Sequence, residues 1–147
     1  MLSELERKLQ RPFPPLQLNW KKGKGGSGDL AYLTARHVMN RLDQVFGLAG
    51  WQTKYEFMGD RMICNLSVLV EIGGVATWIT KADGSGDTDI EGDKGGISSA
   101  FKRAAVHFGI GRYLYHKEAF DRNRTPAAWA TPEGFDSMMA ERELKEE

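Results

Sequence analysis

Two adjacent cations, Lys102 and Arg103, stand in a stretch whose apolar residues recur at helical spacing. At about 100° per residue, these apolar residues fall within an arc of about 100°: Ile97, Phe101, Ala104, Ala105 and Phe108. Arg103 then points nearly opposite the apolar side, and Lys102 lies at its flank. Such a pair is either an ordinary solvated helix face or a contact for an anion such as a nucleic-acid phosphate. The pattern alone leaves both readings open.

A second candidate site is the acidic loop that precedes this helix. Asp87, Asp89 and Glu91 alternate, and Gly92 follows at the sixth position of a calcium-loop pattern. The twelfth position is Ser98, where such a loop needs a bidentate glutamate. The sequence therefore favours a solvated acidic loop, with a weak divalent-metal site as the alternative.

The other residues whose side chains could take part in catalysis do not form a recognisable catalytic set. The three histidines have no metal-ligand spacing, and no Ser/His/Asp or Cys/His arrangement is evident. The glycine-rich "GKGGSG" lacks the Ser/Thr and helix of a phosphate loop, and "GIG" follows a helix rather than a strand. The sequence predicts neither an enzyme nor a bound cofactor.

Composition indicates a folded domain of ordinary size. The 147 residues are 41% hydrophobic and 27% charged, which is typical of a globular chain with a real core. Cys64, the only cysteine, lies in an apolar run and is expected in that core. No window approaches the apolar length of a membrane span, and "MLSELERKLQRPF" lacks the apolar core of a signal peptide. A cytoplasmic, nucleoid-associated protein is expected.

The formal net charge is zero, but the charges are unevenly distributed. Residues 1–24 and 101–124 each hold six Lys/Arg and two acids, whereas residues 83–93 hold five acids and the last fifteen residues hold six. Basic patches can therefore exist on a neutral chain, and a polyanionic partner remains compatible with the composition.

The predicted elements alternate between helix and strand. Residues 2–9 predict a short helix, because Ser3 and Glu6 have capping-box spacing, and a longer helix is predicted from about Leu30 to Phe46. Between them lies the basic, glycine-rich "KKGKGGSGD".

The central part of the chain predicts strands. "WQTKYEF", "MICNLSVLVEI" and "VATWIT" are separated by Gly-containing turns and predict a three-stranded antiparallel meander. A loop over 81–96 and a helix from about Ile97 to Phe108 follow. The class is α+β, with a core domain over 1–124 and a linker and acidic tail over 125–147. That tail is either a short helix or disordered.

Two motifs, taken with the order of elements, resemble a known family. "HVMNRLDQVFGLAGW" (37–51) and "FKRAAVHFGIGRYLY" (101–115) flank the strands, as in the Rad52/Rad22 family of single-strand annealing proteins. The resemblance covers about residues 19–120. The start, "LERKLQRPFPPLQLNWK", is most similar to the branch of DNA damage response protein A (DdrA) known from Deinococcus.

The resemblance implies an ATP-independent protein of DNA repair that binds single-stranded DNA by its backbone and assembles into a homo-oligomeric ring. By position it assigns Lys102, Arg103 and Lys94 to an inner DNA groove. It also assigns Lys22, which stands in place of an arginine, and Tyr32 to this inner groove. It assigns Arg61 to an outer, second DNA site on the strand hairpin.

The sequence also departs from the annealing members of the family. An arginine that they carry one turn after the Lys-Arg pair is Val106 here, and the segment before the last core helix is short and acidic. Both changes favour binding and protection of DNA ends over annealing of complementary strands. Two alternatives remain open: an oligomeric scaffold that binds no DNA, and a metal nuclease that uses the acidic loop.

Overall fold

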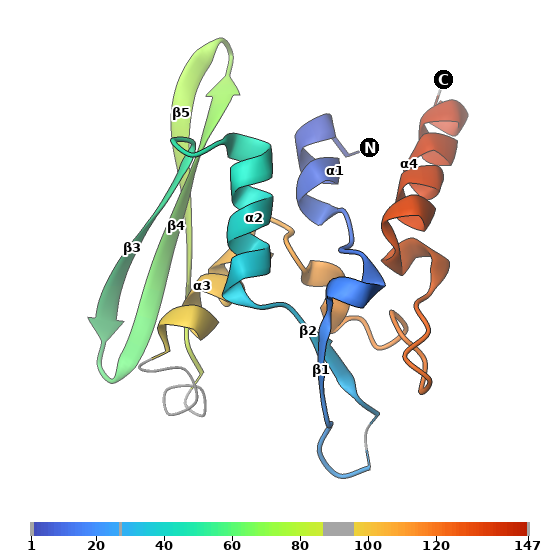
Figure 1. Ribbon diagram of the computed structural model, residues 1–147. Helices are drawn as coiled ribbons and strands as arrows, with labels where there is room; N and C mark the ends of the chain where they lie inside the picture. The colour runs from blue at the N-terminus through green and yellow to red at the C-terminus, as the bar shows by residue number, and fades with distance from the viewer. Residues whose placement is uncertain (1, 27, 87–95, 147) are drawn as a thin grey trace. The chain divides into compact units, whose positions relative to one another are not determined.

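The computed structural model describes residues 2–26, 28–86 and 96–146, and it contains two compact units (Figure 1). Residues 34–110 form the central unit, and residues 1–33 with 111–147 form the terminal unit. Helices and antiparallel strands occur in both units, which confirms the predicted α+β class.

The central unit is built on a three-stranded antiparallel sheet with the strand order β3–β4–β5. Its strands are β3 (Trp51–Met58), β4 (Arg61–Ile72) and β5 (Val75–Gly84). The predicted meander is confirmed. Strand β5 continues to Gly84, so the loop expected from residue 81 begins later than the sequence indicated.

Two tight turns connect these strands. Met58 pairs with Arg61 and Ile72 pairs with Val75, so each turn contains two residues. The second turn is Gly73–Gly74, and the φ angles of these glycines are 58° and 82°. A type I′ hairpin turn requires positive φ at both central positions, which explains why Gly-Gly predicted this hairpin correctly.

Helices α2 (Ala35–Phe46) and α3 (Ile97–Val106) pack on one face of this sheet (Figure 1). Alternate residues of β4 point into the layer between sheet and helices, and all of them are buried: Met62, Cys64, Leu66 and Val68. Burial raises the pKa of the Cys64 thiol to about 11. The cysteine therefore belongs to the core, as predicted.

The connection between α2 and β3 depends on two glycines. Gly47 ends α2 with a φ of 77°, a left-handed value that glycine adopts at low cost. Gly50 is buried, and its backbone approaches α2 so closely that a Cβ atom there would overlap the Phe46 carbonyl. The "FG-x-x-GW" motif thus encodes a compact helix-to-strand turn.

The start of α2 differs from the prediction. The helix begins at Ala35, whereas Leu30–Tyr32 form strand β2. Thr34 is the N-cap, and its backbone N–H donates to Nδ1 of His37 at 3.0 Å. The helical spacing of the apolar residues continues upstream of this cap, but the backbone there is used for strand pairing.

The end of α3 also differs from the prediction, because the helix stops at Val106 and not at Phe108. Its buried residues are Ala100, Phe101, Ala104 and Ala105. Ile97, which the helical wheel grouped with them, is 45% exposed in the first turn.

The terminal unit combines the two ends of the chain. Its elements are α1 (Glu4–Gln10), η1 (Pro15–Gln17), β1 (Asn19–Lys21), β2 (Leu30–Tyr32), η2 (Arg112–Tyr115), η3 (Ala128–Ala130) and α4 (Pro132–Glu146). The predicted capping box of α1 is present, since Glu6 N–H donates to Ser3 Oγ and Ser3 N–H donates to Glu6 Oε1. The hydrogen bond from the Ser3 backbone N–H to the carboxylate lowers the pKa of Glu6.

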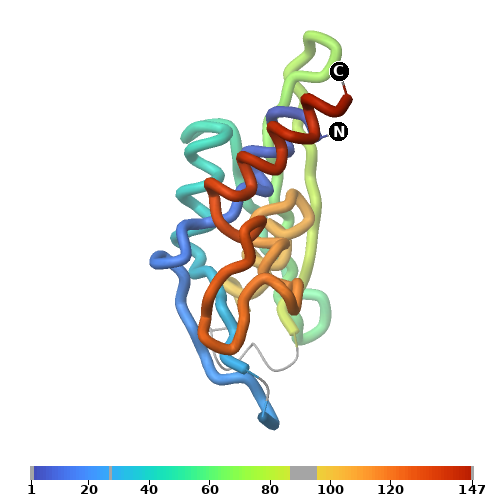
Figure 2. The backbone as a smooth tube through the Cα atoms, turned by 90° about the vertical axis from the view of Figure 1, so that its right-hand side faces the viewer, coloured from blue at the N-terminus to red at the C-terminus, as the bar shows by residue number. Residues whose placement is uncertain are grey.

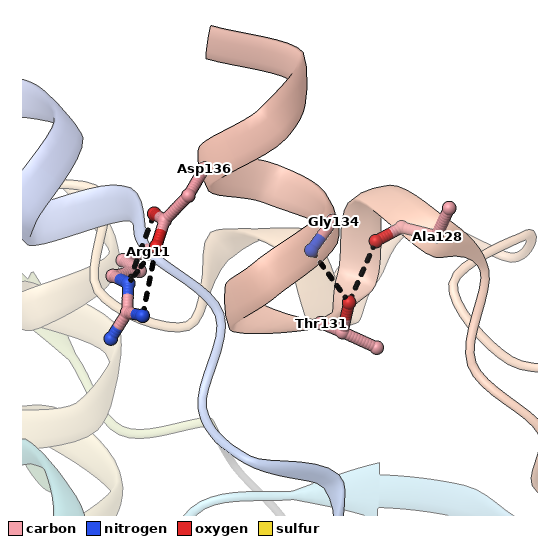
Figure 3. A network of polar contacts seen from close by, with 5 residues as sticks. All are labelled: Arg11, Ala128, Thr131, Gly134 and Asp136. Carbon is pink, nitrogen blue, oxygen red and sulfur yellow. Dashed lines mark hydrogen bonds and ion pairs between the residues drawn. The ribbon is translucent and has the colours of Figure 1, made fainter. Parts of the chain in front are cut away.

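The acidic segment at the C-terminal end is helical, which is one of the two expected states. Thr131 caps α4: its Oγ1 accepts the Gly134 N–H at 3.0 Å and donates to the Ala128 carbonyl at 2.9 Å (Figure 3). Phe135 and Met139 are buried along one side of α4. The division into a core domain over 1–124 and a linker and tail over 125–147 stays a prediction.

Ion pairs connect α4 to the N-terminal segment. Asp136 accepts two guanidinium N–H groups of Arg11 at 2.9 to 3.2 Å, and this hydrogen bonding raises the pKa of Arg11 (Figure 3). Glu143 pairs with Arg7 one turn earlier in α1. The earlier arginine pairs with the later acid and the later arginine with the earlier acid, so α1 and α4 are antiparallel. Figure 2 shows the end of α4 near the start of α1. Among the described residues, no helix has the length and apolarity to cross a bilayer.

The close approach at Gly50 gives the first testable prediction. Gly50→Ala should lower the free energy of unfolding by about 1–3 kcal/mol, because the new methyl group must displace the carbonyl that ends α2. Urea denaturation followed by circular dichroism measures this change.

Gly28→Ala is the matched control, since Gly28 is exposed and a Cβ atom there meets nothing within 4 Å. It should change the unfolding free energy by less than about 0.5 kcal/mol. Equal stability of the Gly50 variant and the wild type would show that the helix-to-strand turn is not constrained as described.

Candidate nucleic-acid interface

The rotation of α3 about its axis determines where Lys102 and Arg103 point. Phe101 stacks on Trp51 of β3, with ring centroids 5.9 Å apart and an interplanar angle of 25°. Ala104 and Ala105 are fully buried on the same side. Arg103 is consequently exposed and Lys102 is half-buried at the flank, as the helical wheel indicated.

The N-terminal end of α3 is anchored to strand β4. Gly96 precedes the helix with a φ of 85°, and a Cβ atom there would lie 2.6 Å from Ser85. Ser85 in turn donates its N–H to the Met62 carbonyl at 2.9 Å and accepts the Met62 N–H at 3.3 Å. Gly96 is thus required for the packing of the N-terminal end of α3.

Arg61 occupies the position next to this anchor. It is the exposed first residue of β4, one residue before Met62. The central unit therefore places the helix that carries Lys102 and Arg103 against the strand that Arg61 begins. Assignment of Arg61 to a second DNA site stays a prediction.

The other two described candidates lie in the terminal unit. Strands β1 and β2 pair antiparallel with Asn19 opposite Tyr32 and Lys21 opposite Leu30. Lys22 is exposed in the loop that follows β1, and Nζ of Lys21 lies 5.6 Å from the centroid of the Tyr32 ring. Tyr32 is therefore on a strand rather than on the helix that the sequence predicted.

The candidates thus fall into two sets, Lys102, Arg103 and Arg61 in the central unit and Lys22 and Tyr32 in the terminal unit. Their combination in a single groove stays a prediction. Lys94 and the acidic residues Asp87, Asp89 and Glu91 lie outside the described residues. In the described ranges, no group of three or more His, Cys, Asp or Glu side chains is arranged to hold a metal ion.

Each of the three histidines has a structural contact. His37 caps α2 at the Thr34 N–H, and His116 packs edge-on against Trp129 at 5.4 Å. Nε2 of His107 lies 2.9 Å from the Asp83 carboxylate on β5.

A cluster that sequence reasoning missed lies beside the β1–β2 hairpin. Arg124 binds the Asp29 carboxylate through Nε and Nη2, at 3.0 and 2.7 Å. Its guanidinium carbon lies 4.9 Å from the centroid of the Trp20 ring, and Phe120 packs edge-on against Trp20 at 5.0 Å. Arg124 and Asp29 are 95 residues apart, so no local pattern indicates the pair.

Comparison with known proteins gives a consistent family assignment. Residues 1–128 match the Rad52/22 family of double-strand break repair proteins. The chain is 37% identical over 120 residues to the single-stranded DNA-binding protein DdrA of Deinococcus deserti, covering 78% of this chain and 58% of that protein. It is 32% identical over 121 residues to DdrA of Deinococcus radiodurans, covering 78% and 56%. The chain thus spans less than two thirds of these relatives.

Proposed function

The chain belongs to the Rad52/22 family of double-strand break repair proteins, and we propose that it binds single-stranded DNA through the phosphate backbone. The names of both relatives, single-stranded DNA-binding protein DdrA, support this proposal. The structural observation that carries it is the Lys102–Arg103 pair. The opposite side of their helix is locked in the core, and Arg103 is exposed.

The proposed mechanism is electrostatic. Lysine and arginine side chains neutralise phosphates and release counterions, which gives affinity without reading the base sequence. Lys102 and Arg103 supply these contacts from α3, and Lys22 and Lys94 add to them. Tyr32 offers an aromatic face for a base or sugar, and Arg61 serves a second DNA contact on the β3–β4 hairpin. No chemical step is proposed, since binding requires neither ATP nor catalysis.

Protection of DNA ends is the proposed outcome of binding. Val106 follows Arg103 by one turn on α3, at the position to which the family resemblance assigns a further arginine of the annealing members. Bringing two DNA strands together on one protein requires neutralisation of two phosphate backbones, so fewer cations favour the binding of one strand. The proposed setting is DNA repair in the cytoplasm, in association with the nucleoid.

Assembly into a ring is part of the proposal. Within the described residues, strands β3 and β5 each pair only with β4, which leaves one edge of each available for a neighbouring subunit. Several large apolar side chains on the turns of this sheet are exposed: Phe57, Met58, Ile72 and Val75. Exposed apolar groups of this kind support an oligomer interface. Repetition around a ring turns a few contacts per subunit into a continuous track.

The groove assignment predicts the effect of removing both α3 cations. The double variant Lys102→Ala/Arg103→Ala should bind a labelled oligothymidylate at least about 100-fold more weakly, because two charge-assisted phosphate contacts are lost. Fluorescence anisotropy measures the affinity, and size-exclusion chromatography checks that the oligomer is retained.

The matched control is Arg142→Ala/Lys145→Ala, which removes the same charge from the exposed side of α4. The wild-type affinity should also fall steeply and linearly on logarithmic axes between about 50 and 200 mM salt. Binding by the α3 variant at moderate salt would refute the groove assignment, and a flat salt response would contradict phosphate contacts. Absence of wild-type binding would favour the scaffold alternative.

End protection and annealing can be separated at Val106. The wild type should slow exonuclease digestion of single-stranded ends while accelerating annealing of complementary oligonucleotides only weakly. Val106→Arg should increase the annealing rate by about fivefold or more, since it adds one phosphate contact per subunit.

Val106→Gln is the control for side-chain size and polarity, and it should anneal as slowly as the wild type. Rapid annealing by the wild type, or equal rates for all three proteins, would contradict the role assigned to this position. Stopped-flow fluorescence with strand-specific labels provides the rates.

The ring proposal predicts a mass change when the β4–β5 turn becomes charged. Ile72→Lys/Val75→Lys replaces side chains that are 54% and 63% exposed, so the subunit should still fold. The oligomer should dissociate, because the new lysine charges would be buried without partners at an apolar interface. Native mass spectrometry gives the subunit number.

Leu144→Lys on α4 is the control, since Leu144 is 72% exposed outside the sheet. It should leave the oligomer mass unchanged. A monomeric wild type would remove the basis for the ring, and an unaltered mass of the double variant would exclude this turn from the interface.

A further inference from the structure

The basic loop between β1 and β2 is intrinsically difficult to hold in one conformation. Each strand has only three residues, and an isolated two-stranded hairpin is marginal in water. In its described residues, 22–26 and 28–29, the loop contains Lys22 and Lys24, and Gly25 and Gly26 have positive φ angles of 59° and 82°. Glycine-rich chains lose much conformational entropy on ordering. A loop of this composition gains order from contacts with other parts of the chain.

Arg124 contacts both ends of this loop with one side chain. Its guanidinium lies over the ring of Trp20, which is the central residue of β1 before the loop. The same group donates two hydrogen bonds to Asp29, which directly precedes β2 after the loop. A planar guanidinium can stack by its face and bind a carboxylate by its edge at the same time. Arg124 thereby joins the two stems of the hairpin.

The backbone at Arg124 has an unusual conformation for an arginine. Its φ angle is 62°, and it is the sole non-glycine residue with positive φ in the described part of the chain. Glycine, asparagine or aspartate are the usual residues in this conformation. Asp121 fixes the turn, because its carboxylate accepts the N–H groups of Asn123 and Thr125 at 2.8 and 2.9 Å. The contacts of the side chain explain the presence of an arginine here.

We infer that Arg124 is a positioning residue that fixes the ends of the segment between β1 and β2, so that Lys22 and Lys24 are presented to the phosphate backbone; this inference rests on the proposed DNA binding. Arg124 acts through Asp29 and Trp20 and makes no phosphate contact of its own. Arg124 lies in "FDRNRT", a segment that follows the second family motif. In the sequence, this arginine is visible only as one of the basic residues of the region 101–124.

Amide hydrogen exchange tests the anchor without DNA. Arg124→Ala and Asp29→Asn should each accelerate exchange over residues 21–30 at least about tenfold while exchange in α3 is unchanged. Arg122→Ala is the matched control, because Arg122 is an exposed arginine of the same turn that loses an equal charge. Unchanged exchange in both anchor variants would overturn the inference, whatever the DNA-binding result.

DNA binding then separates positioning from direct contact. Asp29→Asn removes a negative charge, so simple electrostatics would strengthen binding to DNA. A positioning role instead predicts that Asp29→Asn and Arg124→Ala each weaken binding about tenfold, and that the double variant is no weaker than either single variant. The slope of log affinity against log salt concentration should fall in magnitude by about two, because two lysine contacts with phosphates are lost. Arg122→Ala should stay within about twofold of the wild type.

Two results would overturn the positioning role. Tighter binding by Asp29→Asn together with weaker binding by Arg124→Ala would identify Arg124 itself as the phosphate ligand. Wild-type affinity in both variants despite faster exchange would show that loop order does not matter for DNA. Failure of the wild type to bind DNA would refute the proposed function, while hydrogen exchange would still decide whether the anchor exists.

Discussion

The packing of α3 against the sheet is the contact on which the proposed interface depends. Phe101 stacks on Trp51, and the fully buried alanines on either side of it allow the helix backbone to approach the strands closely. Dense packing of this kind permits little rotation of the helix about its axis. The direction of Arg103 is therefore a consequence of core packing, and a phosphate-binding residue is most effective when its support is rigid.

The sequence predicted the elements whose signals are local. The capping box at Ser3, the Gly-Gly turn at 73–74 and the alternation along β4 each involve neighbouring residues, and all three are present. The helical wheel of α3 also indicated the correct exposed side. The prediction was wrong where tertiary pairing overrides a local pattern, since Leu30–Tyr32 fit a helical repeat but pair with Asn19–Lys21. Arg124 and Asp29 could not be paired from sequence at all, because 95 residues separate them.

The zero net charge of the chain has a structural explanation that is compatible with DNA binding. In the terminal unit, Arg7 and Arg11 are neutralised by Glu143 and Asp136 of α4. The acids at the C-terminal end therefore compensate particular arginines of the N-terminal segment. Lys22 and Lys24 remain exposed in the hairpin loop. Total charge averages over these separate roles, whereas an interface with DNA depends on the local distribution.

The family motifs mostly describe packing, and this sharpens the functional assignment. In "FG-x-x-GW", Gly47 ends a helix, Gly50 meets a carbonyl and Trp51 supports Phe101. In the second motif, Ala104 and Ala105 fill the core, while Gly109 and Gly111 adopt φ angles of 100° and 74°. Each of these residues is required by geometry alone. Lys102 and Arg103 differ from them, because they lie outside the buried side of α3. The proposed phosphate contacts assign these two motif positions to the DNA interface.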